Sequence, residues 1–324
     1  MHNLIVLSIG FMLIGEKIMS LSATVIRAFF NYKNPIQRIL SGHSIRESIL
    51  NDDLDLDEKA VKLGGQVFPK SGYCCVLAGG AGSGKGFIQS TKILADFKVL
   101  DVDFLKKLYR QAVAVGVIDD EHGDYDLANP EDVSTLHAKV KELGWDKKRE
   151  SWFFDYCAAN GKLPNVLFDI TGRETVRLTN IGRTAKAVGY SVVLVWVVTP
   201  RQVAIIQNLS RDRKVGQKVF HSVHNAVITS VFSFLKGLAY DYDQAFIVFN
   251  PGRDLSSLPP EMQEVAKKYD VVELEKSGSS FIIPPEIEAD ILSFLGKTDD
   301  PDAPSVYKDF KDIDVSAGPS NVFK

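Results

Sequence analysis

The chain has 324 residues, which is enough for one large domain or two modest ones with a substantial buried core. Its apolar fraction of 45% and charged fraction of 24% are those of ordinary globular proteins. A formal net charge of −3 excludes a globally basic chain of the kind that coats nucleic acid or binds anionic membranes, although a local basic patch remains compatible with it.

The N-terminus begins with an apolar run that is too short to span a bilayer. Leu4–Ile14 is followed by two charged residues, and only one histidine precedes it, whereas a secretory signal carries basic residues there. The stretch Gly15–Met19 back-translates as GGA-GAA-AAA-ATT-ATG, which places a ribosome-binding GGAG upstream of Met19. We therefore expect translation to begin at Met19, and a short apolar leader over 1–18 is the alternative.

Composition divides the rest of the chain into three parts. A helical, charge-mixed extension covers 19–71, an alternation of strands and helices covers 72–296, and an acidic tail with prolines covers 297–324. The tail has too few aliphatic residues to bury a core of its own, so we expect it to be disordered. We expect the chemistry in the middle part.

The middle part alternates short β-branched runs with longer amphipathic helices. Each run is almost continuously apolar, as in strands that are covered on both faces. This alternation predicts an α/β fold with a central parallel sheet flanked by helices. The predicted strands are Tyr73–Leu77, Lys98–Val102, Asn165–Ile170, Ser191–Val198 and Ala245–Phe249, and the clearest helices are Glu174–Val188, Arg201–Arg211 and Phe220–Tyr240.

The three cysteines indicate a reducing compartment. Cys74 and Cys75 are adjacent in the first apolar run, where side chains alternate between faces, and Cys157 stands alone. No metal-ligand spacing is present among them. We expect reduced, buried thiols and a cytoplasmic protein.

The strongest motif is a glycine-rich loop that directly follows the first predicted strand and begins a predicted helix. It has the form G-x-x-x-x-G-K, which in this context is typical of phosphate-binding loops of P-loop NTPases. Glycines let backbone N–H groups approach phosphate oxygens, and the lysine reaches the β- and γ-phosphates. We expect ATP to bind at Gly79, Gly80, Ala81, Gly82, Ser83, Gly84, Lys85, Gly86 and Phe87. A glycine-rich turn with a surface lysine is the alternative.

One position departs from the motif. Gly86 follows Lys85, where a Ser or Thr hydroxyl usually binds Mg²⁺, and Phe87 comes next. We therefore expect Mg²⁺ to be held through water and acidic residues, with Asp169 as the best candidate.

Two predicted strands end in aspartate, at the edge where ligands bind in open α/β sheets. Phosphoryl transfer needs a carboxylate that orients the attacking hydroxyl and accepts its proton. Asp103 suits this role, with Lys106 one helical turn on to hold the acceptor; Asp101 is the weaker candidate. Capping of a helix explains Asp103 equally well. Asp169 suits metal ligation, and Arg173, shortly after it, is a candidate for binding substrate.

A basic segment follows the fourth predicted strand, with four cations around Gly216. Arginines that close over a γ-phosphate spread its transition-state charge. Arg211 and Arg213 are therefore candidate catalytic cations on a lid that is hinged at Gly216. A solvated helix end whose cations complement the helix dipole is the alternative.

In this order, the loop, the two aspartates and the basic segment resemble the zeta-toxin and polynucleotide-kinase branch of P-loop kinases. That branch has D-x-x-R after the second strand and an arginine-rich lid before K-x-V-P or a similar sequence. The corresponding residues here are Asp103, Lys106, Arg211, Arg213 and Lys218–Phe220, within a resemblance that covers roughly Tyr73–Phe249. The resemblance implies that Asp103 is the general base, that Lys106 contacts the substrate and that the arginines are lid cations.

The motifs and the resemblance together predict a kinase that uses ATP and Mg²⁺ to phosphorylate a hydroxyl group. The acceptor stays open among a nucleotide sugar, a nucleoside or nucleic-acid component, and a small metabolite. The reason is a long insertion, with an acidic loop at Asp119–Asp132, where related kinases shape the acceptor pocket. The alternatives are a nucleoside-monophosphate kinase, a kinase of hydroxymethylated pyrimidines in DNA, and a non-catalytic nucleotide-binding regulatory protein. No membrane partner is expected.

Overall fold

The computed structural model describes residues 60–63, 66–90, 94, 97–158, 163–211, 214–252 and 255–295. The leader over 1–18, most of the extension over 19–71, the acidic tail over 297–324 and Arg213 lie outside the described residues. The chain divides into two compact units. The first combines the described residues up to Ser71 with those of Asp96–Asn165, and the second combines those of Gly72–Ala95 with those from Val166 onward.

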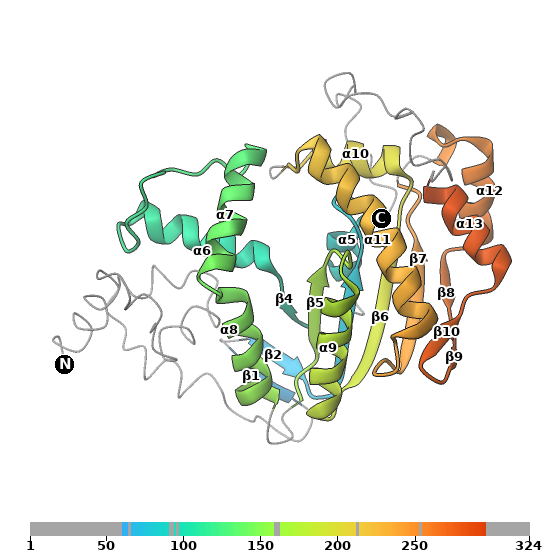
Figure 1. Ribbon diagram of the computed structural model, residues 1–324, viewed down its shortest axis with the longest axis horizontal. Coiled ribbons are helices and arrows are strands. Elements are labelled where there is room, and N and C mark those ends of the chain that lie inside the picture. Colours follow the sequence, from blue (N-terminus) through green and yellow to red (C-terminus); the bar gives the residue numbers. More distant parts are fainter. Residues whose placement is uncertain are drawn as a thin grey trace. The chain divides into compact units, whose positions relative to one another are not determined.

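The second unit is built on a mostly parallel sheet (Figure 1). In spatial order its strands are β5 (Val166–Ile170), β3 (Tyr73–Ala78), β6 (Ser191–Val198), β7 (Gln244–Phe249) and β8 (Val271–Glu273). The first four run parallel, and β8 pairs antiparallel with β7. After its first residue, β3 is buried along its whole length, as expected for a strand between two neighbours that is covered on both faces.

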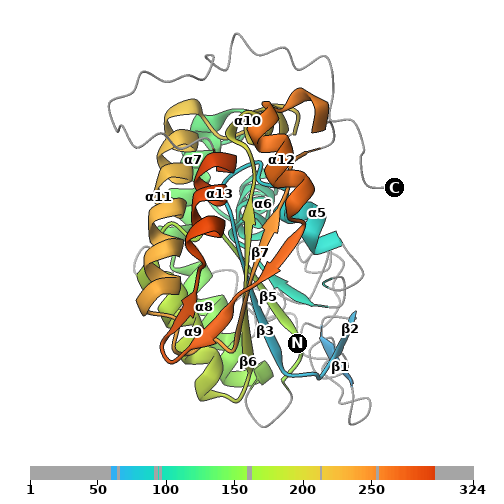
Figure 2. The ribbon, with the colours of Figure 1, turned by 90° about the vertical axis from the view of Figure 1, so that its right-hand side faces the viewer.

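Helices cover this sheet because their apolar side chains recur on one face. On α9 (Thr175–Ala187), for example, Leu178, Ile181 and Ala185 are buried at spacings of three and four, and this helix contacts β3 and β6. Figure 2 shows α9 and α11 (Gln217–Gly237) on one face of the sheet and α5 (Lys85–Ser90) on the other. The predicted α/β fold, a parallel sheet flanked by helices with the glycine-rich loop after its first strand, is therefore confirmed.

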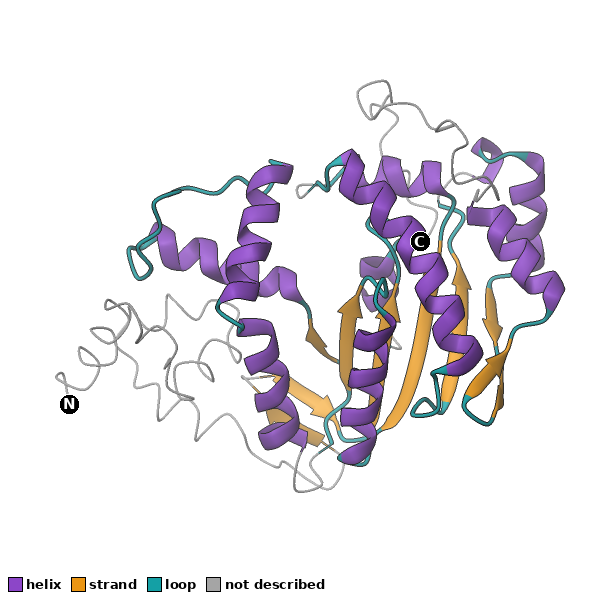
Figure 3. Cartoon of the chain, viewed as in Figure 1, coloured by secondary structure: helices purple, strands orange, loops and turns teal. Residues whose placement is uncertain are grey.

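The remaining elements of the second unit complete these layers (Figure 3). They are α5 (Lys85–Ser90), α10 (Arg201–Leu209), α11 (Gln217–Gly237), a 3₁₀ turn (Leu255–Ser257), α12 (Pro260–Lys268), the hairpin of β9 (Glu275–Ser277) with β10 (Ser280–Ile282), and α13 (Pro285–Leu295). Across the part of the chain that the structure describes, no helix is both long enough and apolar enough to cross a membrane.

The first unit is mainly helical. Its elements are the hairpin of β1 (Ala60–Leu63) with β2 (Gln66–Pro69), β4 (Lys98–Leu100), α6 (Val102–Ala114), α7 (Pro130–Glu142), and α8 (Trp145–Trp152), which continues into a π-helical turn (Phe153–Ala158). Leu105, Leu108 and Ala112 on α6 pack with Leu136 and Val140 on α7 in one buried cluster. This cluster is the core of the first unit.

The strand before Asp103 is shorter than predicted. β4 ends at Leu100 instead of Val102, and Asp103 lies inside the first turn of α6. Asp101 causes the early end, because its carboxylate accepts a hydrogen bond from the Phe104 amide at 2.6 Å and caps the helix. The capping role that was open for Asp103 therefore belongs to Asp101.

The adjacent cysteines lie in the middle of the parallel sheet. Cys74 and Cys75 on β3 are both buried as free thiols. Burial raises the pKa of the Cys75 thiol to about 12, which keeps it protonated at neutral pH. Both residues therefore serve as small apolar core side chains, as the sequence predicted; the side chain of Cys157 lies outside the described part.

Candidate nucleotide-binding site

The glycine-rich loop, which follows β3, is anchored at the ends of three other parallel strands of the sheet. The Gly79 amide donates to the carbonyl of Thr171, just beyond β5, at 3.1 Å. The carbonyl of Ser83 accepts hydrogen bonds from Thr199, just beyond β6, at 2.7 Å, and from the Asn250 amide group, just beyond β7, at 2.8 Å. The loop is thus seated at the edge of the sheet where α/β proteins bind ligands.

Two glycines of the loop are required by close approach to neighbouring helices. Gly82 has a φ of +71°, and a Cβ there would lie 2.1 Å from the carbonyl oxygen of Ala204 on α10. A Cβ at Gly80 would lie 2.4 Å from Nε2 of His224 on α11. No larger side chain fits at either position unless a helix or the His224 ring moves.

Lys85 lies folded back over this loop. Its ammonium group donates to the carbonyl of Gly79 at 2.6 Å and to the carbonyl of Gly80 at 3.2 Å. The same nitrogen lies 3.8 Å from Oδ1 of Asp169 on β5. The surface-lysine alternative does not describe this residue, because its side chain is only 14% exposed and its charge faces the loop.

Asp169 collects donors from two elements. In addition to Lys85, the side-chain amide of Gln89 on α5 donates to Oδ2 of Asp169 at 2.6 Å. Sequence reasoning missed Gln89. Its position four residues after Lys85 was the available signal, because residues at that spacing share one face of a helix.

Arg211 brings a second cation to the same carboxylate. Burial lowers the pKa of the Arg211 guanidinium, and the negative charge of Asp169 opposes this shift, so the two groups lie within electrostatic reach of each other. One terminal nitrogen of Arg211 donates to Oδ1 of Asn208 at 2.8 Å, and its Nε finds no hydrogen-bond partner among the described residues. The solvated-helix-end alternative therefore does not describe Arg211.

Asn208, which sequence reasoning also missed, organises the start of the basic segment. Its side chain is fully buried at the end of α10. Its Nδ2 donates to the carbonyl of Val215 at 2.9 Å, and its Oδ1 accepts from the Val215 amide at 3.0 Å as well as from Arg211. These bonds close a loop between α10 and α11 that holds Arg211 in place; Gly216 caps α11 at the end of this loop.

Asp103 and Lys106 form an ion pair on α6 of the first unit. Lys106 Nζ lies 3.4 Å from Oδ1 of Asp103, whose side chain is 44% exposed, whereas that of Lys106 is only 9% exposed. The backbone before this pair is fixed by Arg149, which is buried and donates to the carbonyls of Val99 at 2.9 Å and Asp101 at 2.8 Å. Burial lowers the pKa of Arg149 to about 10, so it stays charged. No sequence motif singled out Arg149.

The remaining predicted residues are exposed. Arg173 pairs with the neighbouring Glu174 at 3.1 Å, and its carbonyl accepts from Ser230 of α11 at 2.6 Å. Phe87 on α5 is 41% exposed, and a Cβ at Gly86 would meet no atom within 4 Å. The position of the missing hydroxyl is therefore open space.

The residues present suit Mg²⁺ that is held mainly by a nucleotide. Asp169 supplies a partly exposed carboxylate beside the loop, and Mg²⁺ usually takes one or two protein carboxylates together with phosphate oxygens and waters. Within the described residues, no three His, Cys, Asp or Glu side chains form a metal-binding group. A site formed by protein ligands alone is therefore not found in that part of the chain.

Comparison with known proteins yields structural likenesses only. No family model matches the chain, and no curated protein matches it in sequence. A chain of the native AvrRxo1-ORF1:-ORF2 complex aligns at 13% identity with a TM-score of 0.46; the alignment covers 68% of this chain and 63%, under two thirds, of that chain. A chain of the same complex with ATP aligns at 12% identity with a TM-score of 0.49, over 91% and 73% of the two chains.

A chain of the PezAT chromosomal toxin–antitoxin system of Streptococcus pneumoniae aligns at 13% identity with a TM-score of 0.42, over 85% of this chain and 94% of that one. At these identities and TM-scores, the likenesses assign neither a family nor an activity to the chain. The case for function therefore rests on the residues of the loop and its neighbours.

Proposed function

We propose that this chain is an ATP-dependent phosphotransferase that moves the γ-phosphate of ATP to a hydroxyl group of an acceptor. The observation that carries the proposal is the meeting of two cations and one carboxylate at the glycine-rich loop. Lys85 touches the loop carbonyls and Asp169, and Arg211 lies within electrostatic reach of that carboxylate with a buried donor to spare. Such a set binds a polyphosphate and stabilises the charge that develops on a transferred phosphoryl group.

In the proposed reaction, the acceptor hydroxyl oxygen attacks the γ-phosphorus. The bond between that phosphorus and the oxygen that bridges it to the β-phosphate breaks, and ADP leaves. The proton of the hydroxyl passes to the carboxylate of Asp103, which acts as general base, while Lys106 and Arg173 bind the acceptor. Arg211 and Arg213 spread the charge of the transferred group.

Lys85 must exchange partners when ATP binds. Its ammonium group gives up the carbonyls of Gly79 and Gly80 and donates to β- and γ-phosphate oxygens instead. Asp169 would hold Mg²⁺, directly or through water, and the ion would supply charge neutralisation to the phosphates. Gln89 keeps one oxygen of Asp169 oriented by its 2.6 Å hydrogen bond.

Transfer of labelled phosphate tests the proposal. The chain is incubated with γ-labelled ATP and panels of nucleotide sugars, nucleosides, 5′-hydroxyl DNA and hydroxymethylated DNA. Lys85→Met is expected to weaken ATP binding by about 100-fold or more, because the cation inside the loop is lost. Asp103→Asn is expected to keep the Kd for ATP within about twofold and to reduce transfer by roughly 10²–10⁴-fold, the usual contribution of a general base.

Matched control variants show whether losses of ATP binding or transfer come from the named residues or from the removal of any charge. Lys267→Met removes an exposed lysine of α12, and Asp124→Asn removes an exposed aspartate of the first unit, and both variants should transfer phosphate like the wild type. Full transfer by Asp103→Asn would show that this residue is not the general base. Absence of ATP binding by the wild type would overturn the proposal as a whole.

A non-catalytic nucleotide-binding regulator is the second candidate. It is favoured by the open space at Gly86, where no hydroxyl is present to bind the metal, and by the engagement of Asp169 with Lys85 and Gln89. In the same assay, label that moves to any acceptor decides for the kinase. Tight ATP binding with only slow release of inorganic phosphate decides for the regulator.

A further inference from the structure

A histidine of α11 is built into the glycine-rich loop. His224 is 6% exposed, and its Nε2 lies 2.8 Å from the carbonyl oxygen of Ala81, inside the loop. The whole edge of the ring faces Gly80, because a Cβ at that glycine would lie 2.4 Å from Nε2, 2.5 Å from Cε1 and 2.7 Å from Cδ2. The ring occupies the space that a side chain at Gly80 would need.

The chemistry of this contact defines the state of the ring. A carbonyl oxygen only accepts, so Nε2 must carry the hydrogen that it donates to Ala81. The ring is neutral at physiological pH, because its pKa is lowered to about 4. Burial is the main cause, the bond to Ala81 opposes the shift, and the nearby charges of Arg201, Lys85 and His221 add to it. His224 is thus a fixed neutral donor.

Phe220 holds this ring from the other side. It precedes His224 by one helical turn, is fully buried, and stacks on the imidazole with ring centroids 4.3 Å apart at an angle of 30°. Phe220 packs in a cluster with Ala204 and Ile205 of α10, and Ala81 and Val215 lie against that cluster. Phe220 therefore packs against the face of the His224 ring.

We propose that His224 is a positioning residue for nucleotide binding, which holds the phosphate loop in its binding conformation through the Nε2–H bond to Ala81 and the contact with Gly80. The inference rests on the proposed function of the loop as the ATP site. A glycine-rich loop loses backbone conformational entropy when it becomes ordered around a ligand. A side chain that orders the loop before the ligand arrives reduces this loss and so strengthens binding.

Substitutions of His224 that keep or remove the donor test the hydrogen bond. His224→Gln places an amide N–H at a similar reach and is expected to keep the Kd for ATP within about threefold. His224→Leu leaves the Ala81 carbonyl without its donor and is expected to raise the Kd about tenfold, which corresponds to the roughly 1.4 kcal/mol of a buried unsatisfied group. His221→Leu, the same change one turn earlier on α11, is the control and should bind ATP like the wild type.

A double-mutant cycle tests the contact with Gly80. Gly80→Ala is expected to raise the Kd for ATP about tenfold or more, because its Cβ meets the His224 ring at 2.4 Å. In the His224→Ala background, where the ring is absent, the same change is expected to cost less than threefold. Amide hydrogen exchange over residues 79–85, measured without nucleotide, should accelerate in His224→Leu and stay near the wild-type rate in His224→Gln.

The outcomes are distinct. Wild-type-like ATP binding and exchange in both His224→Leu and Gly80→Ala would overturn the inference, and so would purely additive effects in the cycle. Equal losses in His224→Leu and His224→Gln would show that the donor is not what matters. If the wild type binds no ATP while the exchange results follow expectation, the proposed function fails and the ordering role of His224 stands.

Discussion

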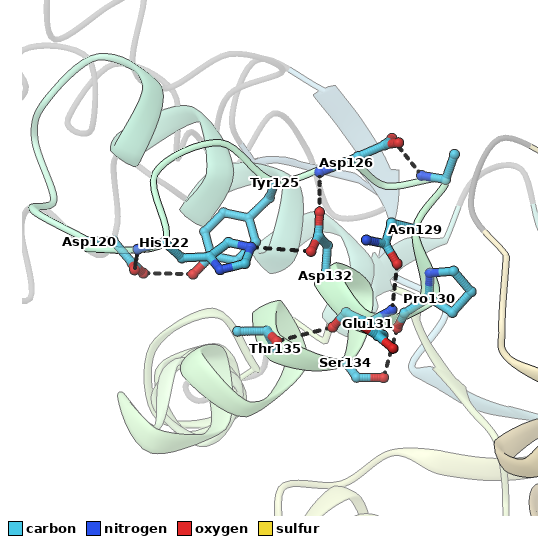
Figure 4. A network of polar contacts seen from close by, with 11 residues as sticks. Asp120, His122, Tyr125, Asp126, Asn129, Pro130, Glu131, Asp132, Ser134 and Thr135 are labelled. Carbon is cyan, nitrogen blue, oxygen red and sulfur yellow. Dashed lines mark hydrogen bonds and ion pairs between the residues drawn. The ribbon is translucent and has the colours of Figure 1, made fainter.

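Two loops of this protein are ordered in opposite ways. The glycine-rich loop between β3 and α5 is held through its backbone, by carbonyls that accept from Thr199, Asn250 and His224. The loop between α6 and α7 is held through two carboxylates that are largely shielded from solvent, those of Asp120 and Asp132. Figure 4 shows this second arrangement, in which Asp120 and Asp132 bind His122, Tyr125 and Asp126 of the loop.

In the α6–α7 loop the polar groups satisfy one another. Asp120, whose side chain is 3% exposed, accepts from the hydroxyls of Tyr109 at 2.5 Å and Tyr125 at 2.8 Å, and lies 3.8 Å from Nζ of Lys139. Burial alone would raise the pKa of Asp120, but the donors outweigh it and hold the pKa below its usual value. Burial and the bond to Asp120 raise the pKa of Tyr109 well above its ordinary range, so it remains a donor.

At the glycine-rich loop, by contrast, some buried polar groups lack hydrogen-bond partners. The hydroxyl of Ser83 and the Nε of Arg211 are buried and have no hydrogen-bond partner among the described residues. Buried donors without partners are costly, and such cost concentrates at functional sites. The α6–α7 loop therefore satisfies its own buried polar groups, whereas two buried polar groups at the glycine-rich loop lack partners among the described residues, in keeping with the proposed ATP site.

The largest effect on the free energy of unfolding is expected from a substitution in the α6–α7 loop. Asp120→Ala leaves two buried tyrosine hydroxyls and one lysine without their acceptor, and is expected to lower the free energy of unfolding by about 3 kcal/mol. Urea unfolding measures this loss. Asp124→Ala, the same change at an exposed position of that loop, should cost less than about 0.5 kcal/mol. Similar losses in both variants would contradict the account of Asp120 as the structural centre.

The next effect is a pH dependence of stability, which falls in different pH ranges for the two loops. His224 has a folded-state pKa of about 4 against an ordinary value of 6.5, so the unfolded chain binds the extra proton between these values. Its contribution to stability is present above pH 6.5 and is lost as pH falls towards 4, by up to about 1.4 kcal/mol per pH unit. The lowered pKa of Asp120 acts only below its ordinary 3.8, where protonation of the unfolded chain removes the stability that its donors provide.

Urea unfolding at several pH values measures this separation. The His224→Gln variant should show a smaller slope between pH 6.5 and 4 than the wild type, because glutamine does not titrate. His221, whose pKa burial also lowers, keeps part of that slope. Asp120→Ala should keep that slope. An unchanged pH dependence in His224→Gln would contradict the buried, neutral state of this histidine.

The smallest effect is expected from a substitution at Gly86, in the glycine-rich loop. Gly86→Ser enters open space in the first turn of α5 and is expected to change stability by about 0.5 kcal/mol or less, in the favourable direction. The new hydroxyl should strengthen ATP binding in the presence of Mg²⁺ and leave it unchanged with EDTA, as calorimetry would show. Gly82→Ser is the control that should lose ATP binding, because its Cβ would lie 2.1 Å from Ala204 O. Equal losses in both variants would contradict the open position at Gly86.

Local sequence determined much of this fold. Continuous apolar runs predicted β3, β5, β6 and β7 to within one residue at either end, because strands that are buried on both faces tolerate few polar side chains. The glycines and lysine of the phosphate loop were equally visible, since positive φ and close backbone approach leave few other choices. Capping and catalysis stayed equally open for Asp103 in the sequence, because its residue type and its position after a strand suit both roles.

Tertiary structure decided which residues share the candidate site. Gln89, Asn208 and His224 belong to none of the motifs. Packing of α5, α10 and α11 brings Gln89 to Asp169, Asn208 to Arg211 and His224 to Ala81. The different roles of Gly80 and Gly86 could not be predicted from the sequence. Gly80 lies against a buried ring and Gly86 beside open space, and only the packing of neighbouring elements distinguishes the two. The sequence by itself thus determined the strands, the loop and its lysine, which depend on local backbone and burial. Packing decided the loop's neighbours, because contacts between distant segments exist only once the sheet has assembled.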